Sequence, residues 1–203
     1  MSVRALPNIL TGLRLVLALF VFGALIAIAG AVPGWRPDLA VGAILIRLAL
    51  AAFVIAAVTD FFDGWLARRL QATSVWGAIL DPIADKVLVC ATLVGLLAGG
   101  GVALTIPAGL ILMREFAVSG LREVVAARGL KLPVTWLAKW KTTIQLVALA
   151  ALIVLFGWPA FGLPLTWALP WAEASFALLW LAAAITVLTG AQYFAQARAA
   201  LRS

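Results

Sequence analysis

The sequence predicts an all-α membrane protein that crosses the bilayer several times. Of its 203 residues, 66% are hydrophobic, and the mean hydropathy is +1.15. These values are typical of chains built from transmembrane helices, not of water-soluble domains. A transmembrane helix needs about 20 apolar residues, so the length accommodates roughly six spans and leaves no room for a second, soluble domain. We therefore expect a single transmembrane domain over residues 1–203.

Breaks that contain Gly, Pro or polar residues divide the chain into apolar stretches. Six transmembrane helices are predicted, over residues 9–29, 39–62, 78–98, 102–126, 140–157 and 174–195. The first stretch shares features with a secretory signal peptide, because a basic residue precedes it and Ala29-Gly-Ala31 follows it. Arg14 inside this stretch, together with the five later stretches, favours a helix that is retained.

The basic residues predict which way the chain crosses the membrane. They concentrate near residue 4, at 68–69, over 128–141 and at 198–202, which a six-span chain places on one side. The opposite loops carry few basic residues and are instead rich in Trp. Lys and Arg are enriched in cytoplasmic loops, and Trp is enriched at membrane interfaces. Both termini are therefore expected in the cytoplasm.

Composition narrows the chemistry that the chain can perform. The single cysteine, Cys90, excludes an internal disulfide, and the absence of histidine excludes His ligands, nucleophiles and bases. Catalysis must then use carboxylates, Lys, Arg, hydroxyl groups or a metal ion. The net charge of +7 fits a membrane surface or anionic substrates. We expect no nucleic-acid partner, because the basic residues lie at helix ends and form no solvated patch.

Four of the five aspartates fall in one short stretch. Asp60 and Asp63 are three residues apart, and Asp81 and Asp85 are four apart, so each pair lies on one face of a helix. Carboxylates within a membrane are costly and usually functional. If the two faces meet, their like charges require a positive partner, and hard divalent cations prefer carboxylate oxygens. With both termini in the cytoplasm, these aspartates are expected at the cytoplasmic end of the bundle.

The whole stretch has the pattern Asp-x2-Asp-Gly-x2-Ala-Arg-x8-Gly-x3-Asp-x3-Asp. This pattern resembles the signature of the CDP-alcohol phosphotransferases, which are integral membrane enzymes of phospholipid synthesis, and all eight fixed positions are present. The resemblance implies that Asp60, Asp63 and Asp81 bind Mg²⁺ or Mn²⁺, as two divalent ions, and that Asp85 is the general base and also contacts metal. It also implies a CDP-diacylglycerol site that includes Asp63 and these residues: Gly64, Ala67, Arg68 and Gly77. For the small residues, close helix packing is the alternative.

Three further segments carry the resemblance along most of the chain. The N-terminal element Pro7-Asn8-Ile-Leu-Thr11-Gly-Leu-Arg14 resembles the part of the family that meets the nucleotide, which implies that Asn8, Thr11 and Arg14 contact CDP-diacylglycerol. The other segments, around Arg114–Glu123 and Lys139–Gln145, are similar to those of members that make phosphatidylglycerol phosphate, as is Gln192-Tyr193.

Four basic residues of these later segments are predicted to bind the phosphate of sn-glycerol 3-phosphate: Arg114, Arg122, Lys139 and Lys141. Arg114 lies near the middle of a predicted span, where an unpaired cation is costly, and Glu115 is a candidate partner for it. Arg122 has two alternatives, since it can pair with Glu123 or extend to the interface. The lysines can also serve only as cytoplasmic topology signals.

The expected reaction is transfer of the phosphatidyl group of CDP-diacylglycerol to sn-glycerol 3-phosphate, by direct displacement in the bacterial inner membrane. The resemblance also implies a homodimer and an active site that faces the cytoplasm. Two alternatives stay open. One is a sister enzyme with inositol phosphate, serine or phosphatidylglycerol as acceptor. The other is a cation transporter that uses the aspartates as a midplane site.

Overall fold

The computed structural model describes residues 6–70, 75–130 and 136–201. Within these ranges it describes the side chains of 9–60, 80, 82–130, 136–137 and 140–201. The described residues form α-helices and short 3-10 turns and contain no strand, which confirms the all-α prediction. The helices are α1 (Leu6–Ile28), α2 (Leu39–Leu70), α3 (Val75–Ala98), α4 (Thr105–Ala127), α5 (Trp136–Phe156) and α6 (Ala168–Ala200). The 3-10 turns are η2 (Val102–Leu104), η3 (Trp158–Phe161) and η4 (Leu165–Trp167).

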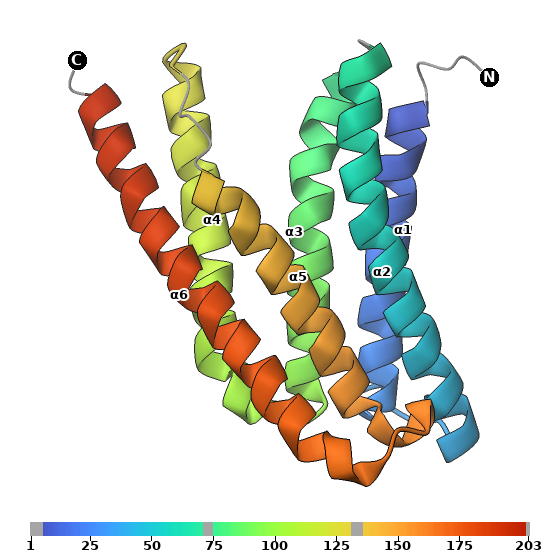
Figure 1. The fold of residues 1–203 in the computed structure, drawn as a ribbon. Helices are drawn as coiled ribbons and strands as arrows, with labels where there is room; N and C mark the ends of the chain where they lie inside the picture. The colour runs from blue at the N-terminus through green and yellow to red at the C-terminus, as the bar shows by residue number, and fades with distance from the viewer. Residues whose placement is uncertain (1–5, 71–74, 131–135, 202–203) are drawn as a thin grey trace.

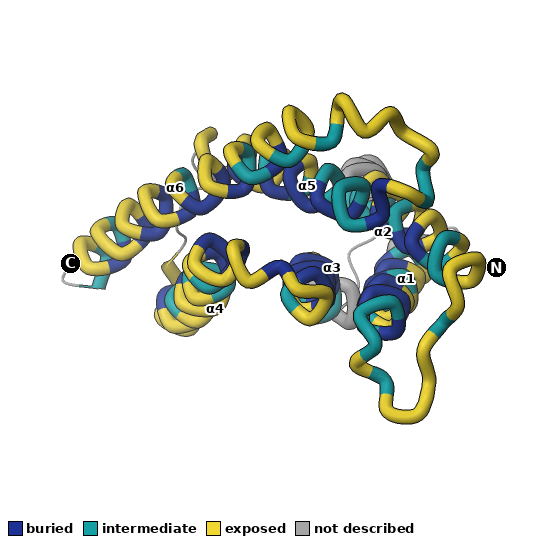
Figure 2. Tube along the Cα trace, turned by 90° about the horizontal axis from the view of Figure 1, so that it is seen from below, coloured by how far each residue is buried: buried dark blue, intermediate teal, exposed yellow. Residues whose placement is uncertain are grey.

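The helices stand in two rows. Viewed along the bundle, α6, α5 and α2 form one row, and α4, α3 and α1 form the other (Figure 2). Helix α1 packs against α2 and α3, α6 packs against α4 and α5, and α5 joins the two halves through α2 and α3. Figure 1 shows that α1 starts and α6 ends at the same end of the bundle. Helix α2 ends, α3 starts and α4 ends at that end too.

Many apolar side chains lie on the outside of the bundle. Examples are Val16, Leu48, Met113, Phe116 and Leu188, each at least 49% exposed. Four described segments are long and apolar enough to cross a membrane: Ile9–Ile28, Leu39–Asp60, Val102–Ala127 and Leu165–Ala200. Apolar side chains on the periphery fit acyl-chain surroundings better than water. The chain is therefore a membrane protein.

Local sequence explains where several helices begin and end. The side chain of Asp38 accepts a hydrogen bond from the backbone N–H of Val41 at 2.8 Å and so caps the start of α2. Helices α1 and α4 are each followed, two residues after their last residue, by a glycine with a left-handed backbone, Gly30 (φ 71°) and Gly129 (φ 73°). In both cases the next residue donates its N–H to a carbonyl of the last turn. The end of α4 therefore falls close to the predicted residue 126.

Two helices run furthest beyond the predicted boundaries, and α1, α3 and α5 begin three or four residues earlier than predicted. Helix α2 continues to Leu70, eight residues past the predicted 62, and α6 begins at Ala168 instead of 174. The predictions followed apolarity, which falls at Asp60, whereas the backbone hydrogen bonds continue through Trp, Leu, Ala and Arg. All of these residues are compatible with a helix. The predicted fourth helix is split, since its first three residues form η2.

Arg47 holds the loop at the opposite end of the bundle. Its guanidinium donates hydrogen bonds to the carbonyl oxygen of Ala160 in η3, with a distance of 2.6 Å from Nε. This contact satisfies a carbonyl of the turn and ties α2 to the connection between α5 and α6. Arg47 had no predicted role, and the structure gives it a structural one.

Candidate active site

Two residues of the aspartate-rich stretch, Asp60 and Asp85, lie where α1, α2 and α3 meet. Nη1 of Arg14 is 2.7 Å from Oδ1 of Asp60 and 2.5 Å from Oδ1 of Asp85. One guanidinium nitrogen therefore contacts two carboxylates that come from different helices and are 25 residues apart in the sequence. The faces of α2 and α3 that carry these two residues therefore converge, which the spacing within each helix did not determine.

The burial of the three side chains differs. The side chain of Arg14 is 1% exposed, whereas those of Asp60 and Asp85 are 38% and 52% exposed. A buried cation is stable only when it is paired, so the carboxylates stabilise Arg14 as much as it stabilises them. The exposed parts of the carboxylates leave oxygen atoms accessible to a ligand.

Arg14 lies on the buried face of α1. Thr11, Ala18, Val21 and Leu25 share that face, spaced by three or four residues, and all are buried. Arg14 is therefore turned into the bundle rather than toward lipid, which explains how a cation is tolerated within the first apolar stretch.

Several predicted residues have side chains outside the described part of the structure. In the aspartate stretch these are Asp63, Gly64, Ala67, Arg68, Gly77 and Asp81, and elsewhere they are Asn8 and Lys139. The backbone at these positions is helical. Asp63 and Gly64 follow Asp60 on α2, and Asp81 precedes Asp85 on α3. Their predicted roles stay predictions.

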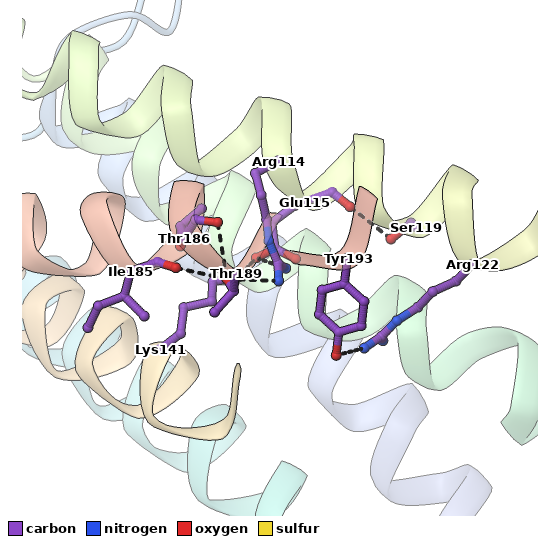
Figure 3. A network of polar contacts seen from close by, with 9 residues as sticks. All are labelled: Arg114, Glu115, Ser119, Arg122, Lys141, Ile185, Thr186, Thr189 and Tyr193. Carbon is purple, nitrogen blue, oxygen red and sulfur yellow. Dashed lines mark hydrogen bonds and ion pairs between the residues drawn. The ribbon is translucent and has the colours of Figure 1, made fainter. Parts of the chain in front are cut away.

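A second polar cluster lies where α4, α5 and α6 meet. Figure 3 shows Arg114, Glu115 and Arg122 of α4 facing Lys141 of α5 and Tyr193 of α6. The Lys141 ammonium forms an ion pair with Oε1 of Glu115, and Nη1 of Arg114 is 3.7 Å from the same oxygen. Glu115 is thus the partner expected for Arg114, and it contacts Lys141 more closely.

Lys141 is 3% exposed, so it does not extend into the aqueous phase as a simple topology signal would. Burial without a partner would be costly for an ammonium group, and Glu115 supplies the partner. Lys141 is therefore part of the interior of the bundle, and the side chain of Lys139 lies outside the described part of the structure.

Arg122 does not use the carboxylate that follows it in the sequence. Its Nη2 donates a hydrogen bond to the hydroxyl oxygen of Tyr193 at 2.8 Å, and Arg114 donates to Thr189 Oγ1 at 3.2 Å. The described contacts give Arg122 no ion pair, so the suggested pairing with Glu123 is not found. Among the side chains that the structure describes, no carboxylate neutralises the positive charge of Arg122.

Both clusters lie in the half of the bundle that contains the two termini. Arg14 is eight residues from the start of α1, and Asp60 and Asp85 are ten residues from the nearer ends of α2 and α3. At 1.5 Å per residue, these positions are about 12–15 Å from the helix ends. Glu115, the partner of Lys141, is twelve residues from the end of α4, which is about 18 Å. Both clusters therefore lie below the helix ends on the same side of the bundle.

A lateral groove of about 660 Å³ opens between α1, α3 and α4. Its wall is mostly apolar and includes Leu19, Phe22, Val94 and Phe116. Lys86, which follows Asp85 directly in the sequence, also lines it. The groove therefore reaches the turn of α3 that carries Asp85, although Asp85 itself does not line it.

Comparison with known proteins identifies the family. The family model described as CDP-alcohol phosphatidyltransferase matches residues 4–188. The chain belongs to this family. A CDP-diacylglycerol–glycerol-3-phosphate 3-phosphatidyltransferase from Cereibacter sphaeroides is 40% identical, with 95% of each chain covered. A protein of the same name from Rickettsia bellii is 43% identical over 70% of this chain and 74% of its own length. Another from Escherichia coli is 41% identical over 73% of this chain and 78% of its own length.

The comparison confirms the family that was identified from the aspartate motif. It also agrees with the later segments, because the relatives carry the name of the expected subfamily. What the sequence did not reveal is the role of Tyr193 and Thr189 as partners of the arginines. A polar stripe on α6, formed by Thr186, Thr189 and Tyr193 at helical spacing, was the available signal.

Proposed function

We propose that this protein transfers the phosphatidyl group of CDP-diacylglycerol to sn-glycerol 3-phosphate, and that it releases CMP and phosphatidylglycerol phosphate. The observation that carries the proposal is the basic cluster where α4, α5 and α6 meet, in which Lys141 is buried, Arg114 is half-buried and Arg122 is exposed. Arg114, Arg122 and Lys141 supply three cations and Glu115 one anion, which leaves a net positive site within an apolar bundle. Such a site favours a dianionic phosphate and disfavours serine or phosphatidylglycerol as acceptor.

The carboxylate cluster fits a divalent metal ion. Asp60 and Asp85 converge on one atom of Arg14, so their oxygens are close enough to share a cation, and hard oxygen donors suit Mg²⁺ or Mn²⁺. Asp60 and Asp85, together with Asp63 and Asp81, are the residues proposed to hold the ions. When bound, they would neutralise the negative charge that develops on the diphosphate during transfer.

The chain's own residues account for the remaining steps. The basic cluster holds the acceptor phosphate and so directs the 1-hydroxyl of glycerol 3-phosphate toward the aspartates. The oxygen of that hydroxyl attacks the lipid-side phosphorus of CDP-diacylglycerol, and Asp85 takes the proton of the hydroxyl as it does so. The bond between this phosphorus and the bridging oxygen breaks, and CMP leaves with the bond's electron pair. Asp85 is partly exposed, so it is accessible to a substrate hydroxyl.

The lateral groove supports a lipid substrate. An acyl chain that lies against Leu19, Phe22 and Phe116 would place its headgroup near Lys86 and Asp85. Burial of such a chain is favourable by about 0.8 kcal/mol per CH₂ relative to water. The start of α1 and the end of α6 lie at one end of the bundle, which supports an even number of spans. We propose six spans with cytoplasmic termini, and an active site that faces the cytoplasm of the bacterial inner membrane. The homodimer implied by the resemblance stays a prediction, which light scattering of the detergent-solubilised protein can test.

An acceptor panel tests the proposed function. Purified protein in detergent receives CDP-diacylglycerol with glycerol 3-phosphate, inositol phosphate, serine or phosphatidylglycerol, and both CMP and the lipid product are measured. We expect CMP release that depends on glycerol 3-phosphate and on a divalent cation. A lipid product formed only from another acceptor would identify a sister enzyme. Absence of CMP release with every acceptor, in the presence of Mg²⁺ or Mn²⁺, would refute the proposal.

Variants separate the two clusters. Asp60→Asn should abolish turnover, and Asp85→Asn should lower kcat, because a base acts when the hydroxyl proton leaves. Lys141→Met should raise the KM for glycerol 3-phosphate by roughly ten- to a hundredfold, the scale of one charge-assisted contact. Arg128→Ala is the control, since Arg128 is exposed at the end of α4. If Lys141→Met changes only the KM for CDP-diacylglycerol, the acceptor site has been placed wrongly.

A further inference from the structure

Tyr193 is the single tyrosine of the chain, and it lies between the two arginines of α4. It is completely buried on α6. Its ring centre is 4.8 Å from Cζ of Arg122 and 5.6 Å from Cζ of Arg114, and its hydroxyl oxygen accepts the hydrogen bond from Arg122 (Figure 3). An aromatic face attracts cations, so the ring and the hydroxyl together favour one arrangement of both guanidinium groups.

The turn before Tyr193 contributes two further contacts. Thr189 donates its own hydroxyl proton to the carbonyl of Ile185 at 2.8 Å, so its oxygen is free to accept from Arg114. Gly190 leaves space for the Arg114 side chain, since a Cβ at that position would lie 3.0 Å from Cγ of Arg114. Thr189, Gly190 and Tyr193 thus form one face of α6 that fits the arginines; we call it the arginine template.

The arginine template contacts both arginines through neutral groups only, although Arg114 also lies 3.7 Å from the carboxylate of Glu115. Lys141 is held by the carboxylate of Glu115, which neutralises it, whereas Arg122 is held by a neutral phenol. An arginine side chain has many rotamers, so an unheld guanidinium would lose conformational entropy when it binds a ligand. Prior positioning by neutral groups removes that cost and keeps the full charge for an anion.

We propose that Tyr193, supported by Thr189 and Gly190, is a positioning residue that arranges Arg114 and Arg122 to receive the phosphate of the acceptor. This inference rests on the proposed function, in which those arginines bind that phosphate. Tyr193 acts on acceptor affinity through the arginines, and it takes no part in proton transfer or in metal binding.

Kinetics of Tyr193→Phe provide the first test, because this change removes the hydroxyl and keeps the ring. The KM for glycerol 3-phosphate should rise about tenfold, the scale of one hydrogen bond to a charged group. The KM for CDP-diacylglycerol and kcat at saturating acceptor should stay within about twofold. Phe194→Leu, at the neighbouring exposed position of α6, is the matched control and should leave all three unchanged.

The single tyrosine also permits a measurement that does not depend on turnover. Protein labelled with ¹³C at Cζ of tyrosine gives one tyrosine signal, which is titrated with glycerol 3-phosphate, and with glycerol as a control without phosphate. We expect a saturable shift with the phosphate ester and none with glycerol. In Arg122→Ala, the shift should be lost or require about tenfold more ligand. No shift at saturating glycerol 3-phosphate in the unmodified chain would overturn the inference, even if Tyr193→Phe fails to fold.

The outcomes distinguish this inference from the proposed function. If Arg122→Ala raises the acceptor KM and Tyr193→Phe does not, the arginine binds phosphate and the positioning role of Tyr193 is wrong. If neither variant changes the acceptor KM, the arginine itself has been placed wrongly, and the proposed acceptor site fails. If Tyr193→Phe lowers kcat with an unchanged acceptor KM, its role lies in the chemical step and the inference is again wrong.

Discussion

Replacement of Arg14 by glutamine tests how the carboxylate cluster is stabilised. Glutamine removes the charge and replaces the guanidinium with a shorter side chain that ends in a hydrogen-bonding amide. In the structure, Arg14 is almost fully buried and pairs with Asp60 and Asp85 at 2.7 and 2.5 Å. Its loss would leave two adjacent carboxylates without their cation. We therefore expect Arg14→Gln to lower the stability of the metal-free protein.

The size of the effect follows from burial. Breaking a fully buried ion pair costs about 3–5 kcal/mol, whereas surface pairs contribute about 0–1 kcal/mol. Here the cation is buried, but the carboxylates are 38% and 52% exposed, so water screens part of the interaction. An intermediate value of about 2 kcal/mol is expected, which lowers Tm by about 4–8 °C for a chain of this length.

Thermal unfolding in detergent, followed by tryptophan fluorescence, measures the effect in chelator and then with Mg²⁺ or Mn²⁺. A divalent cation at the same carboxylates can replace the missing charge, so it should raise the Tm of Arg14→Gln more than that of the unmodified protein. Arg128→Gln, which removes an exposed charge, is the control. An unchanged Tm in chelator would show that the ion pairs contribute little. A decrease that neither cation reduces would contradict metal binding at Asp60 and Asp85.

Three further predictions concern other parts of the bundle. Glu115→Gln should lower Tm, because it leaves nearby cations unpaired. Glycerol 3-phosphate should then raise the Tm of the variant more than that of the unmodified protein, since its phosphate neutralises those cations. An equal rise in Tm in both proteins would refute this. Gly95→Ala should reduce stability by about 1–3 kcal/mol, since the new Cβ would lie 2.6 Å from Cβ of Leu25, whereas Gly23→Ala meets no atom within 4 Å and should not destabilise. Arg47→Met should lower Tm by removing the donor to η3 but leave the KM for both substrates unchanged; altered substrate affinity would contradict a purely structural role.

The sequence predicted those features that depend on residues within one helix. The spacing of Asp60, Asp63, Asp81 and Asp85 placed each pair on a helix face, and apolarity located the six helical stretches. Helix ends were less predictable, because apolarity falls before the hydrogen-bonded backbone ends. Helix α2 shows this, since its last ten residues follow Asp60.

Contacts between helices could not be predicted in the same way. Neither the pairing of Arg14 with Asp60 and Asp85 nor that of Arg122 with Tyr193 follows from sequence spacing, because each depends on the rotation and depth of different helices. Arg14 is an example, since only the nucleotide contact was predicted for it. The structure shows that it already has carboxylate partners within the protein.

The two clusters solve the same electrostatic problem with opposite signs. Arg14 is a cation among carboxylates, and Glu115 is a carboxylate among cations. Charges in an apolar bundle are costly when unpaired, so each cluster needs an opposite charge of its own before a ligand arrives. This opposite charge must not neutralise the whole cluster, because a charged ligand would then have no net charge to bind. Arg122 meets this second requirement, because a phenol positions it while its charge is retained.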